Sequence, residues 1–409
     1  MQSTRREFLG YSLAGLSYVS LSQLPSRLLA QAAAESALAD QNDHVLVLVE
    51  LNGGNDGLNT IIPFEDPLYY KLRPSLAISK EAGLKLNDQL RWHPALGPLA
   101  KMFDAGQVAI AQGVGYPEPD RSHFRSMEIW HTASTNKIVP SSGWLGKFLD
   151  QLPVPGNEVP LSGLALTGTL PQALQAEKVV APVVSQLDTF ASQAESKDLA
   201  SKLRRKLSTS GGGELQPVDF VRQQSAAVYR AADKLNAATS KYKSSVEYFN
   251  NDLANQLKRA AQILSGRLGV RILTVSHGGY DTHSAQADSH QNLLNELATS
   301  LASFQQDLAG LGLADKVVVL VYSEFGRRAD ENASAGTDHG AANCLFVQGA
   351  PVKGGVVGQH PSLEKLGDGD MIFHTDFRQI YATLLEGWLG CPAKQVLTGE
   401  FPKLPLLKA

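Results

Sequence analysis

The stretch HVLVLVELNGGNDGLN, residues 44–59, decides the fold class. It begins with an apolar run and breaks at Gly53 and Gly54. A continuous run of this kind predicts a strand that is buried on both faces, as in parallel sheets. Four further runs share the pattern: QVAIAQGVGYP (107–117), VRILTVSHGGYDTH (270–283), KVVVLVYSEFGRR (316–328) and NCLFVQGAP (343–351).

Helical patterns lie between these runs, for example NLLNELATSLASFQQDLAGL over residues 292–311. Alternating strands and helices predict an α/β fold, with a mostly parallel sheet sandwiched by helices. Right-handed crossovers then bring the loops at the carboxyl ends of the strands to one edge of the sheet. Ligands of open α/β sheets bind at that edge, so we expect the functional site there.

Residues 195–266 depart from this alternation. A polar segment ends in a glycine run at 211–213 and leads into a long helical pattern that ends near Ser265. Apolar residues recur there every seven positions, which predicts a packing stripe along one helix or a bent pair of helices. We therefore expect a helical insertion over 195–266. The residues of the stripe are Val221, Val228, Leu235, Tyr242 and Phe249.

The N-terminus has the features of an export signal. Arg5 and Arg6 precede the segment 8–24, which is too short and too polar to span a bilayer of about 30 Å. Small residues around Ala30 and Ala33 predict a cleaved signal peptide over 1–33. The residues STRREFL resemble a twin-arginine signal, which implies contact with the Tat translocase and a periplasmic protein. The alternative is a basic, frayed N-terminus.

Composition narrows the classes of partner. The chain of 409 residues is 43% hydrophobic and 19% charged, enough for a large buried core. Its net charge is −3 and its one basic cluster is KLRRK, which argues against nucleic acid as a partner. No second apolar segment predicts a stable membrane span. Cys344 and Cys391 are the only cysteines, so a disulfide framework is excluded and a single bridge stays open.

Acids and histidines follow the predicted strands. A carboxylate and an imidazole two residues apart can converge on one cation, and oxygen with nitrogen ligands suits zinc, manganese or iron. Each such residue has a plainer interpretation as a turn or helix cap, and His290 in particular can cap the next helix. We predict a site for one or two divalent ions, zinc or manganese. Its ligands are Asp56, Asp281, His283, Glu324 and His339, the last beside Asp338.

A possible nucleophile lies in GYPEPDRSHFRSMEIW, residues 115–130. A helix begins near Ser122, where free backbone N–H groups favour an anion. We predict that the Ser122 hydroxyl attacks and that Arg121 steadies the anion. The alternative is that Asp120 or Ser122 only caps the helix. His123 and Arg125 are further candidates for holding the anion, and Ser126 and Thr132 for the nucleophile.

Together these residues resemble a bacterial family. It consists of twin-arginine-exported proteins and is known only as a domain of unknown function, placed near the alkaline phosphatase and sulfatase superfamily. The resemblance covers nearly the whole mature chain, and it implies an alkaline phosphatase-like α/β domain over 43–409 with a metal site at the strand ends. The motifs are LVELNGGNDGLNTIIPF, YYKLRP, GVGYPEPDRSHFRSMEIW, GGYDTH, VYSEFGRR, GTDHGAAN and DFRQIYATLLEGWLG.

The resemblance also assigns roles. Asp56 matches the superfamily's first-strand metal carboxylate, and Asp281 with His283 matches its later carboxylate-histidine pair. His339 matches its late histidine. Glu324 falls where the superfamily has an Asp-His dipeptide, and Phe325 replaces the histidine of that dipeptide. This departure puts one of two metal positions in question.

These features predict a periplasmic, metal-dependent hydrolase of phosphate or sulfate esters, with a small-molecule ester as its substrate. A hydroxyl activated by a metal is a plausible nucleophile for such esters. One alternative is a non-catalytic periplasmic binding or assembly protein that keeps the fold, since function resides in sites and not in folds. Another is a structural metalloprotein in which the cation only ties loops together.

Overall fold

The computed structural model of the chain describes residues 43–153, 161–184 and 233–408. The predicted signal peptide over 1–33 lies outside these ranges, as does most of the predicted helical insertion. The domain boundaries at 43–409 and 195–266 therefore stay predictions.

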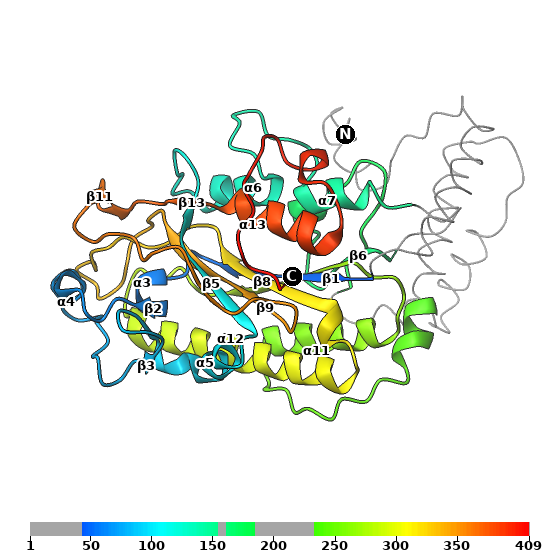
Figure 1. The fold of residues 1–409 in the computed structure, drawn as a ribbon, viewed down its shortest axis with the longest axis horizontal. Coiled ribbons are helices and arrows are strands. Elements are labelled where there is room, and N and C mark those ends of the chain that lie inside the picture. Colours follow the sequence, from blue (N-terminus) through cyan, green and yellow to red (C-terminus); the bar gives the residue numbers. More distant parts are fainter. Residues whose placement is uncertain (1–42, 154–160, 185–232, 409) are drawn as a thin grey trace, which may run out of the picture.

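An eight-stranded sheet forms the centre of the molecule (Figure 1). Every neighbouring pair in it is parallel except the two pairs made by one strand, β9. The predicted mostly parallel sheet is confirmed, and the five predicted strands are β1, β5, β7, β8 and β9. In spatial order the strands are β10 (Gly355–Val357), β5 (Val108–Gly115), β9 (Asn343–Gln348), β8 (Val317–Ser323), β1 (Val45–Asn52), β7 (Ile272–Gly278) and β6 (Gly163–Ala165), with β13 (Thr375–Asp376) paired to β5.

Helices cover both faces of the sheet, as the apolar runs predict. Val47 and Val49 of β1 point into one core and Leu46 and Leu48 into the other, because successive strand side chains alternate. Figure 1 shows α5 (Gly97–Asp104), α11 (Asp252–Ser265) and α12 (Gln286–Gly310) on one face. The other face carries α6 (His123–Thr132), α7 (Trp144–Leu149) and α13 (Phe377–Leu384).

The helix predicted over 292–311 corresponds to α12, which begins earlier, at Gln286, and ends at Gly310 with Leu311 as its C-cap. Its fully buried residues include Leu294, Leu297, Leu301 and Phe304, which are three or four positions apart. That spacing places them on one side of an α-helix. At about 1.5 Å per residue, a helix of 25 residues extends along most of the sheet.

Val221 and Val228 of the predicted stripe lie outside the described residues, and the part of the stripe that the structure describes is only partly helical. Residues 233–239 form a helix, whereas 241–250 are turns and irregular chain. Tyr242 and Phe249 lie in this irregular part, and Phe249 is 61% exposed. The predicted stripe is therefore wrong at these two residues. The Tyr242 and Tyr248 hydroxyl groups both donate to Asp307 of α12, which holds this segment across α12, and a new helix, α11, begins only where Asn251 accepts a hydrogen bond from the N–H of Ala254.

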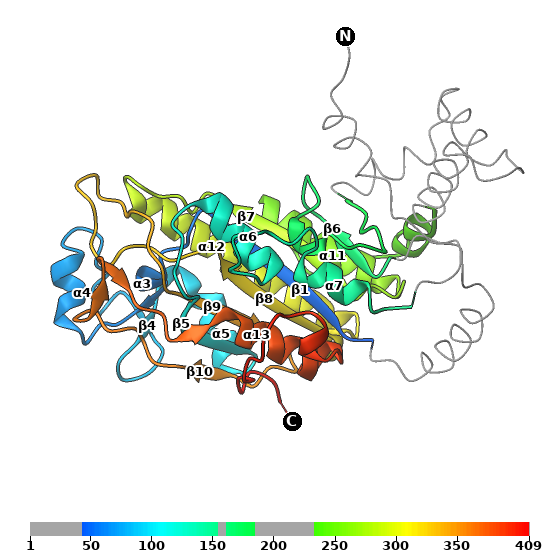
Figure 2. The ribbon, with the colours of Figure 1, turned by 90° about the horizontal axis from the view of Figure 1, so that it is seen from above.

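The carboxyl ends of the parallel strands meet at one edge of the sheet. Strand β1 leads at that edge into the short helix α3 (Gly57–Thr60), and α4 (Pro67–Leu72) follows at the same end of the molecule (Figures 1 and 2). Strand β9 runs the opposite way, so the residues before it lie at the edge that the other strands reach at their ends. His339, which precedes β9, thereby joins residues that follow strands.

Two further expectations concern cysteines and membranes. Cys344 and Cys391 are both buried and unpaired, so the possible bridge does not form in this structure. Among the described residues, no helix has the length and apolarity needed to cross a membrane.

Candidate metal centre

Four side chains from three segments of the chain converge at the carboxyl edge of the sheet. We name His123, Asp281, His283 and His339 the His-Asp cluster. The Nε2 atoms of His283 and His339 lie 3.0 Å apart, and each lies 3.0 Å from Oδ1 of Asp281. His123 Nε2 is 3.4 Å from Oδ2 of the same carboxylate. The ligand atoms of His123, Asp281 and His339 all lie within 4.8 Å of one another.

Each histidine of the cluster binds an oxygen through its other ring nitrogen. An imidazole that donates through Nδ1 carries its lone pair on Nε2, which is the form that ligates a metal. The three lone pairs then face the centre of the cluster. The contacts are His123 Nδ1 with Glu324 Oε1 at 2.8 Å, His283 Nδ1 with Asp338 Oδ1 at 3.0 Å, and His339 Nδ1 with the Arg121 carbonyl oxygen at 2.8 Å.

This donor set fits a first-row divalent metal. Two lone pairs that face each other at 3.0 Å repel unless a proton or cation lies between them. Nitrogen ligands at about 2.0–2.1 Å from a tetrahedral zinc lie about 3.3 Å from one another, close to the spacing of His283 and His339. Three imidazoles and one carboxylate suit zinc, manganese or iron better than calcium or magnesium.

The protonation states agree with this assignment. Burial opposes ionisation of Asp281, but the hydrogen bond and the charge of Arg327 outweigh it and hold the pKa of Asp281 well below its usual range. The hydrogen bond from His283 lowers the pKa of Asp338. The hydrogen bond to Glu324 raises the pKa of His123, so a proton competes with a metal for that ring.

Arg327 holds the strand-end loops in place. Its side chain is fully buried and follows β8, and all its contacts are to the ends of other elements. A buried guanidinium needs such acceptors, because an unpaired one is costly. It therefore fixes Asp281 relative to the turn after β1. Its acceptors are the carbonyl groups of Gly53, Gly54, Tyr280 and Thr337, and Oδ1 of Asp281 at 2.8 Å.

Glu324 lies behind His123 and not among the four cluster residues. Its side chain is 1% exposed, and its two oxygens accept hydrogen bonds from the N–H groups of Gly53 and Gly54 at 2.9 and 3.1 Å. In this structure Glu324 orients the ring of His123 and does not itself belong to the cluster. The sequence predicted it as a direct metal ligand. Its contact with His123 is the only one it makes to the cluster among the described residues.

Asp56 is not brought to the cluster. Arg73 binds both its oxygens, at 2.7 and 3.2 Å, and Gln286 donates to one of them at 2.5 Å. Burial opposes ionisation, but the charge of Arg73 outweighs it and lowers the pKa of Asp56 to about 2. Both side chains of the ion pair are essentially inaccessible. Both oxygens of Asp56 are therefore engaged by buried partners away from the His-Asp cluster.

Of the two residues predicted to be catalytic, Ser122 is exposed, whereas Arg121 is bound by two carboxylates. Ser122 stands at the N-cap position of α6, is exposed and makes no side-chain capping bond. The Arg121 guanidinium is bound by Asp368 at 2.9 Å and Asp370 at 2.6 Å, in the hairpin of β11 (Leu366–Gly367) and β12 (Asp370–Met371). Its charge is therefore largely offset, and only its carbonyl group contacts the cluster, through His339.

The weaker nucleophile candidates are engaged in hydrogen bonds. The Ser126 hydroxyl donates to the Glu324 carbonyl at 2.6 Å, and that of Thr132 to the Glu128 carbonyl at 2.8 Å. Arg125 forms an ion pair with Glu128 at 2.6 Å. These three residues stabilise α6 and its neighbours.

The sequence predicts His123 as a residue that holds an anion, whereas the structure places it in the His-Asp cluster. The signal that could have found this role is its position. It follows β5 across a short loop, just as Asp281 follows β7, so it reaches the same edge of the sheet.

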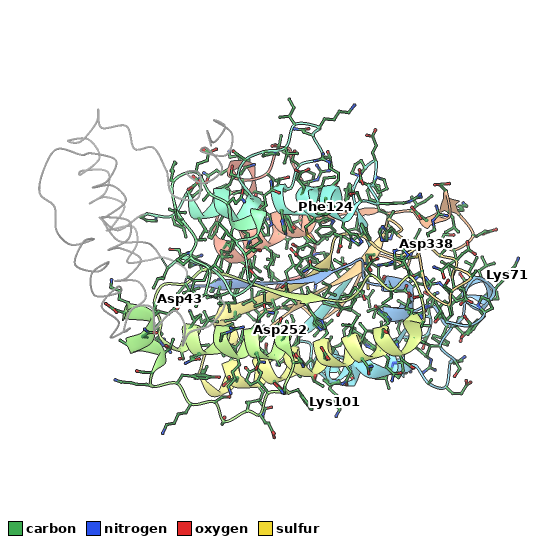
Figure 3. The ribbon with its side chains drawn as sticks, turned by 180° about the vertical axis from the view of Figure 1, so that it is seen from behind. Asp43, Lys71, Lys101, Phe124, Asp252 and Asp338 are labelled. Atoms are coloured by element: carbon green, nitrogen blue, oxygen red, sulfur yellow. The ribbon has the colours of Figure 1, made fainter. Side chains whose placement is uncertain are left out.

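An open cleft of about 610 Å³ adjoins the cluster. Phe124 at its border is 91% exposed. In Figure 3, Phe124 and Asp338 lie on the same side of the sheet, away from Asp43 just before β1. The lining residues are Glu50, Asn52, Gly53, His123, Phe124, Met127, Glu128, His131, Gln172, Asp281 and Glu324.

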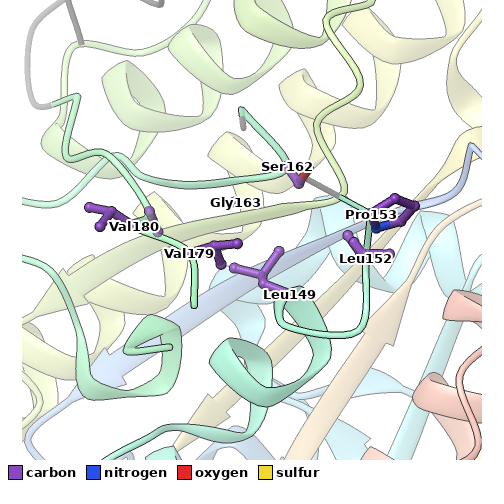
Figure 4. Close-up of a pocket in the computed structure, with 8 residues that line it drawn as sticks. Leu149, Leu152, Pro153, Ser162, Gly163, Val179 and Val180 are labelled. Carbon is purple, nitrogen blue, oxygen red and sulfur yellow. The ribbon is translucent and has the colours of Figure 1, made fainter. Parts of the chain in front are cut away.

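A separate cavity lies between α7 and β6 (Figure 4). It holds only about 10 Å³ and has no titratable side chain in its lining, which includes Leu149, Leu152 and Val179. It is a packing defect of the core, so the cleft beside the cluster is the candidate site.

Comparisons with solved structures found several alkaline phosphatase and sulfatase proteins. A protein in the alkaline phosphatase superfamily from Vibrio parahaemolyticus has a TM-score of 0.41 and 9% identity, over 87% of this chain and 67% of that one. The PsFucS1 sulfatase from Pseudoalteromonas sp. has a TM-score of 0.38 and 11% identity, over 92% and 75%. The lipoteichoic acid synthase LtaP from Listeria monocytogenes has 0.38 and 9%, over 87% and 74%.

A search of curated proteins found no match. The roles of residues in this chain therefore rest on its own geometry. A family model described as "Protein of unknown function (DUF1501)" matches residues 89–390, which is well over half of the chain. The match includes the whole His-Asp cluster. The chain belongs to this DUF1501 family.

Proposed function

We propose that the protein is a metal-dependent hydrolase of small-molecule phosphate or sulfate esters, exported to the periplasm by the twin-arginine pathway. One observation carries the proposal: three imidazoles, each bound to an oxygen through Nδ1, surround the ionised carboxylate of Asp281 beside an open cleft. Metal-ligating histidines typically donate the N–H of their second ring nitrogen to an oxygen in this way. The STRREFL motif supports the export route.

In this proposal the His-Asp cluster holds one divalent cation, zinc or manganese. A cation there supplies Lewis acidity that stabilises negative charge on the ester and lowers the pKa of an attacking hydroxyl. Glu324 and Asp338 fix the rings of His123 and His283. The ion pair between Asp56 and Arg73 favours one ion over two, because it removes the carboxylate that a second ion needs.

Ser122 is our candidate for the attacking group, with water as the alternative. It precedes a cluster residue in the chain, and its exposed hydroxyl makes no capping bond that would have to break. Ser122 does not line the cleft, so attack by its hydroxyl requires the start of α6 to move. Comparing Ser122→Ala with the wild type separates the two: serine attack predicts loss of turnover with metal retained.

A second function, metal-dependent binding without catalysis, is favoured by the state of Arg121. Its charge is offset by Asp368 and Asp370, and no lysine or arginine lines the cleft. A site that turns over anions commonly uses such a cation. Measuring both the metal content and the turnover of the wild type distinguishes this function from hydrolysis.

The test is elemental analysis of the mature protein, with turnover measured on aryl phosphates and aryl sulfates. We expect about one equivalent of a transition metal in the wild type, in line with a four-ligand site. His339→Ala should lose most of it and reduce hydrolysis to background. His374→Ala is the matched control, because His374 binds Gln359 and Thr375 and lies outside the cluster.

Metal and activity retained by His339→Ala would contradict the assignment of the cluster. A wild type that binds metal but hydrolyses no ester would favour the binding function.

A further inference from the structure

Near the carboxyl ends of β1 and β8, the sheet face that α6 covers becomes polar. Leu48 of β1 and Leu320 of β8 are paired neighbours in the apolar core on this face. Two residues further along, the paired neighbours on the same face are Glu50 and Tyr322. Two strand residues span about 7 Å. A carboxylate thus replaces the apolar side chain that would continue the core.

One carboxylate oxygen of Glu50 makes two polar contacts, and the other makes none to a described residue. Its Oε2 accepts a hydrogen bond from the Tyr322 hydroxyl at 2.8 Å and lies 2.5 Å from Nε2 of His131 on α6. Its Oε1 has no hydrogen bond to any described residue, and the side chain is 16% exposed. Oε1 is not a buried atom, so it reaches the cleft, where a ligand can bind it. We name Glu50, His131 and Tyr322 the Glu50 subsite.

The cleft connects the Glu50 subsite with the His-Asp cluster. Glu50 and His131 line it together with His123 and Asp281. From Glu50 to Asn52, the last residue of β1, the strand rises about 7 Å, and the His-Asp cluster lies at the edge of the sheet that this end reaches, so one small, extended ligand can contact both sites. The side chains of Phe124 and Met127 supply an apolar wall between the two polar ends.

A small cavity beside Glu50 is an independent indication that a polar group of a ligand binds there. It measures about 20 Å³ and is lined by Glu50, His131 and Thr274 among others. The Thr274 hydroxyl is buried, and no described residue forms a hydrogen bond with it. The space accommodates one hydroxyl, ammonium or water. A guest there can donate to Glu50 and pair with Thr274.

We propose that the Glu50 subsite binds the alcohol portion of the ester, so that the substrate is a monoester of a polyol or an amino alcohol. This inference rests on the proposed function. A hydroxyl or ammonium group donates to Oε1 of Glu50 while the esterified group lies at the His-Asp cluster. Glu50 is a positioning and specificity residue and takes no part in bond cleavage.

The test measures binding of three phosphonates that cannot be hydrolysed at the C–P bond. Butylphosphonate, 3-hydroxypropylphosphonate and 3-aminopropylphosphonate have the same chain length and differ only in the terminal group. Calorimetric titration uses the metal-loaded mature protein. We expect the wild type to bind one or both donor-bearing ligands at least about tenfold more tightly than butylphosphonate, as for a hydrogen bond to a charged group. The larger preference identifies a hydroxyl or an ammonium as the natural group.

Two variants assign the preference to Glu50. Glu50→Gln keeps the size and an acceptor oxygen, so it should lose most of the preference for the ammonium and less of that for the hydroxyl. Glu50→Met should lose both while binding butylphosphonate as the wild type does. Glu128→Gln is the matched control. Glu128 also lines the cleft but is paired with Arg125, so the preference should persist.

The outcomes separate this inference from the proposed function. Equal, metal-dependent binding of all three ligands by the wild type overturns the Glu50 subsite and leaves the hydrolase proposal standing. A preference that survives both Glu50 variants also overturns it. No binding of any phosphonate by metal-loaded protein overturns the proposed function, and this inference with it. If Glu50→Met does not fold, the isosteric Glu50→Gln decides.

Discussion

At the scale of single residues, Glu324 determines how the ring of His123 is oriented. Its Oε1 accepts from both the Gly53 N–H and the His123 ring, so His123 presents Nε2 to the His-Asp cluster. The carboxylate is buried and held by backbone groups, which leaves it little freedom to turn. A ring fixed in this way loses less entropy when it binds a cation.

Replacing Glu324 by glutamine should weaken metal binding without removing it. The amide oxygen can still accept from the Gly53 N–H and the His123 ring, but with neutral hydrogen bonds, which are about half as strong as charged ones, and the amide NH2 cannot accept from the Gly54 N–H. Loss of an outer partner typically weakens metal affinity about 10- to 100-fold. Competition with a chromogenic chelator measures the affinity, with Glu128→Gln as the control. An affinity equal to that of the wild type would show that Glu324 does not orient the ligand.

The sequence predicted part of the candidate site. Asp281, His283 and His339 do come together, since strand ends of a parallel sheet share an edge. Asp56 also lies at a strand end, but Arg73 binds it, and no spacing rule states which cation will reach an acid. His123 was placed with anion-holding residues because its neighbourhood is rich in arginine. The partners of those arginines are set only by tertiary contacts.

At the scale of elements, the turn after β1 decides whether the cluster assembles. Gly54 has φ of +77° and packs against the ring of Phe325. The Phe325 ring in turn lies 4.9 Å from that of His123 and 4.8 Å from that of His339, between ring centres. A side chain at position 54 would therefore push on the rings of two residues of the His-Asp cluster.

Comparing Gly54→Ala with Gly269→Ala isolates this effect. Gly269 has φ of +76°, so alanine is strained equally at both sites, but a Cβ there meets no atom within 4 Å. At Gly54 the added atom would lie 2.3 Å from the Phe325 ring. We expect Gly269→Ala to cost about 1 kcal/mol of unfolding free energy and to retain metal. Gly54→Ala should cost about 1–3 kcal/mol more and lose metal.

Urea unfolding and metal analysis measure both effects. Equal losses of stability in the two variants, with metal retained in both, would mean that Phe325 moves aside freely. The cluster would then not depend on the packing of this turn.

The strands themselves were predictable, and their directions were not. Each of the five long strands is an apolar run, because both faces of the sheet are covered by helices. Burial is the same for parallel and antiparallel strands, so the run at 343–351 did not reveal that β9 is reversed. The sequence did not predict the short strands β6, β10 and β13, because two or three residues show no periodicity.

At the scale of the whole molecule, two buried histidines link stability to pH. His290 on α12 and His93 before the short helix at 94–96 have ring centres 5.8 Å apart, between the sheet edge and the helix layer. Burial lowers the pKa of His290 to about 4 and that of His93 to about 3. His290 is 2% exposed and bonds to Asn55, so it serves the core and does not face solvent as a free helix cap would.

We expect stability to fall as the medium is acidified. The unfolded chain has histidines with pKa near 6.5, above the folded value of His290, so between these values the unfolded state binds more protons. The contribution of His290 is complete above about pH 6.5 and is lost as the pH falls toward 4. From pH 7.5 to 4.5 it should amount to about 2–3 kcal/mol of unfolding free energy.

Urea unfolding at the two pH values, for the wild type and for His290→Gln, measures this contribution. Glutamine keeps a donor for Asn55 but does not titrate, so the variant should lose about 2–3 kcal/mol less on acidification. The subtraction matters because protonation of the His-Asp cluster also changes stability, and that change is common to both proteins. If the two proteins lose the same free energy, His290 is not a neutral buried group, and the core beside the strand ends must admit water or a counter-charge.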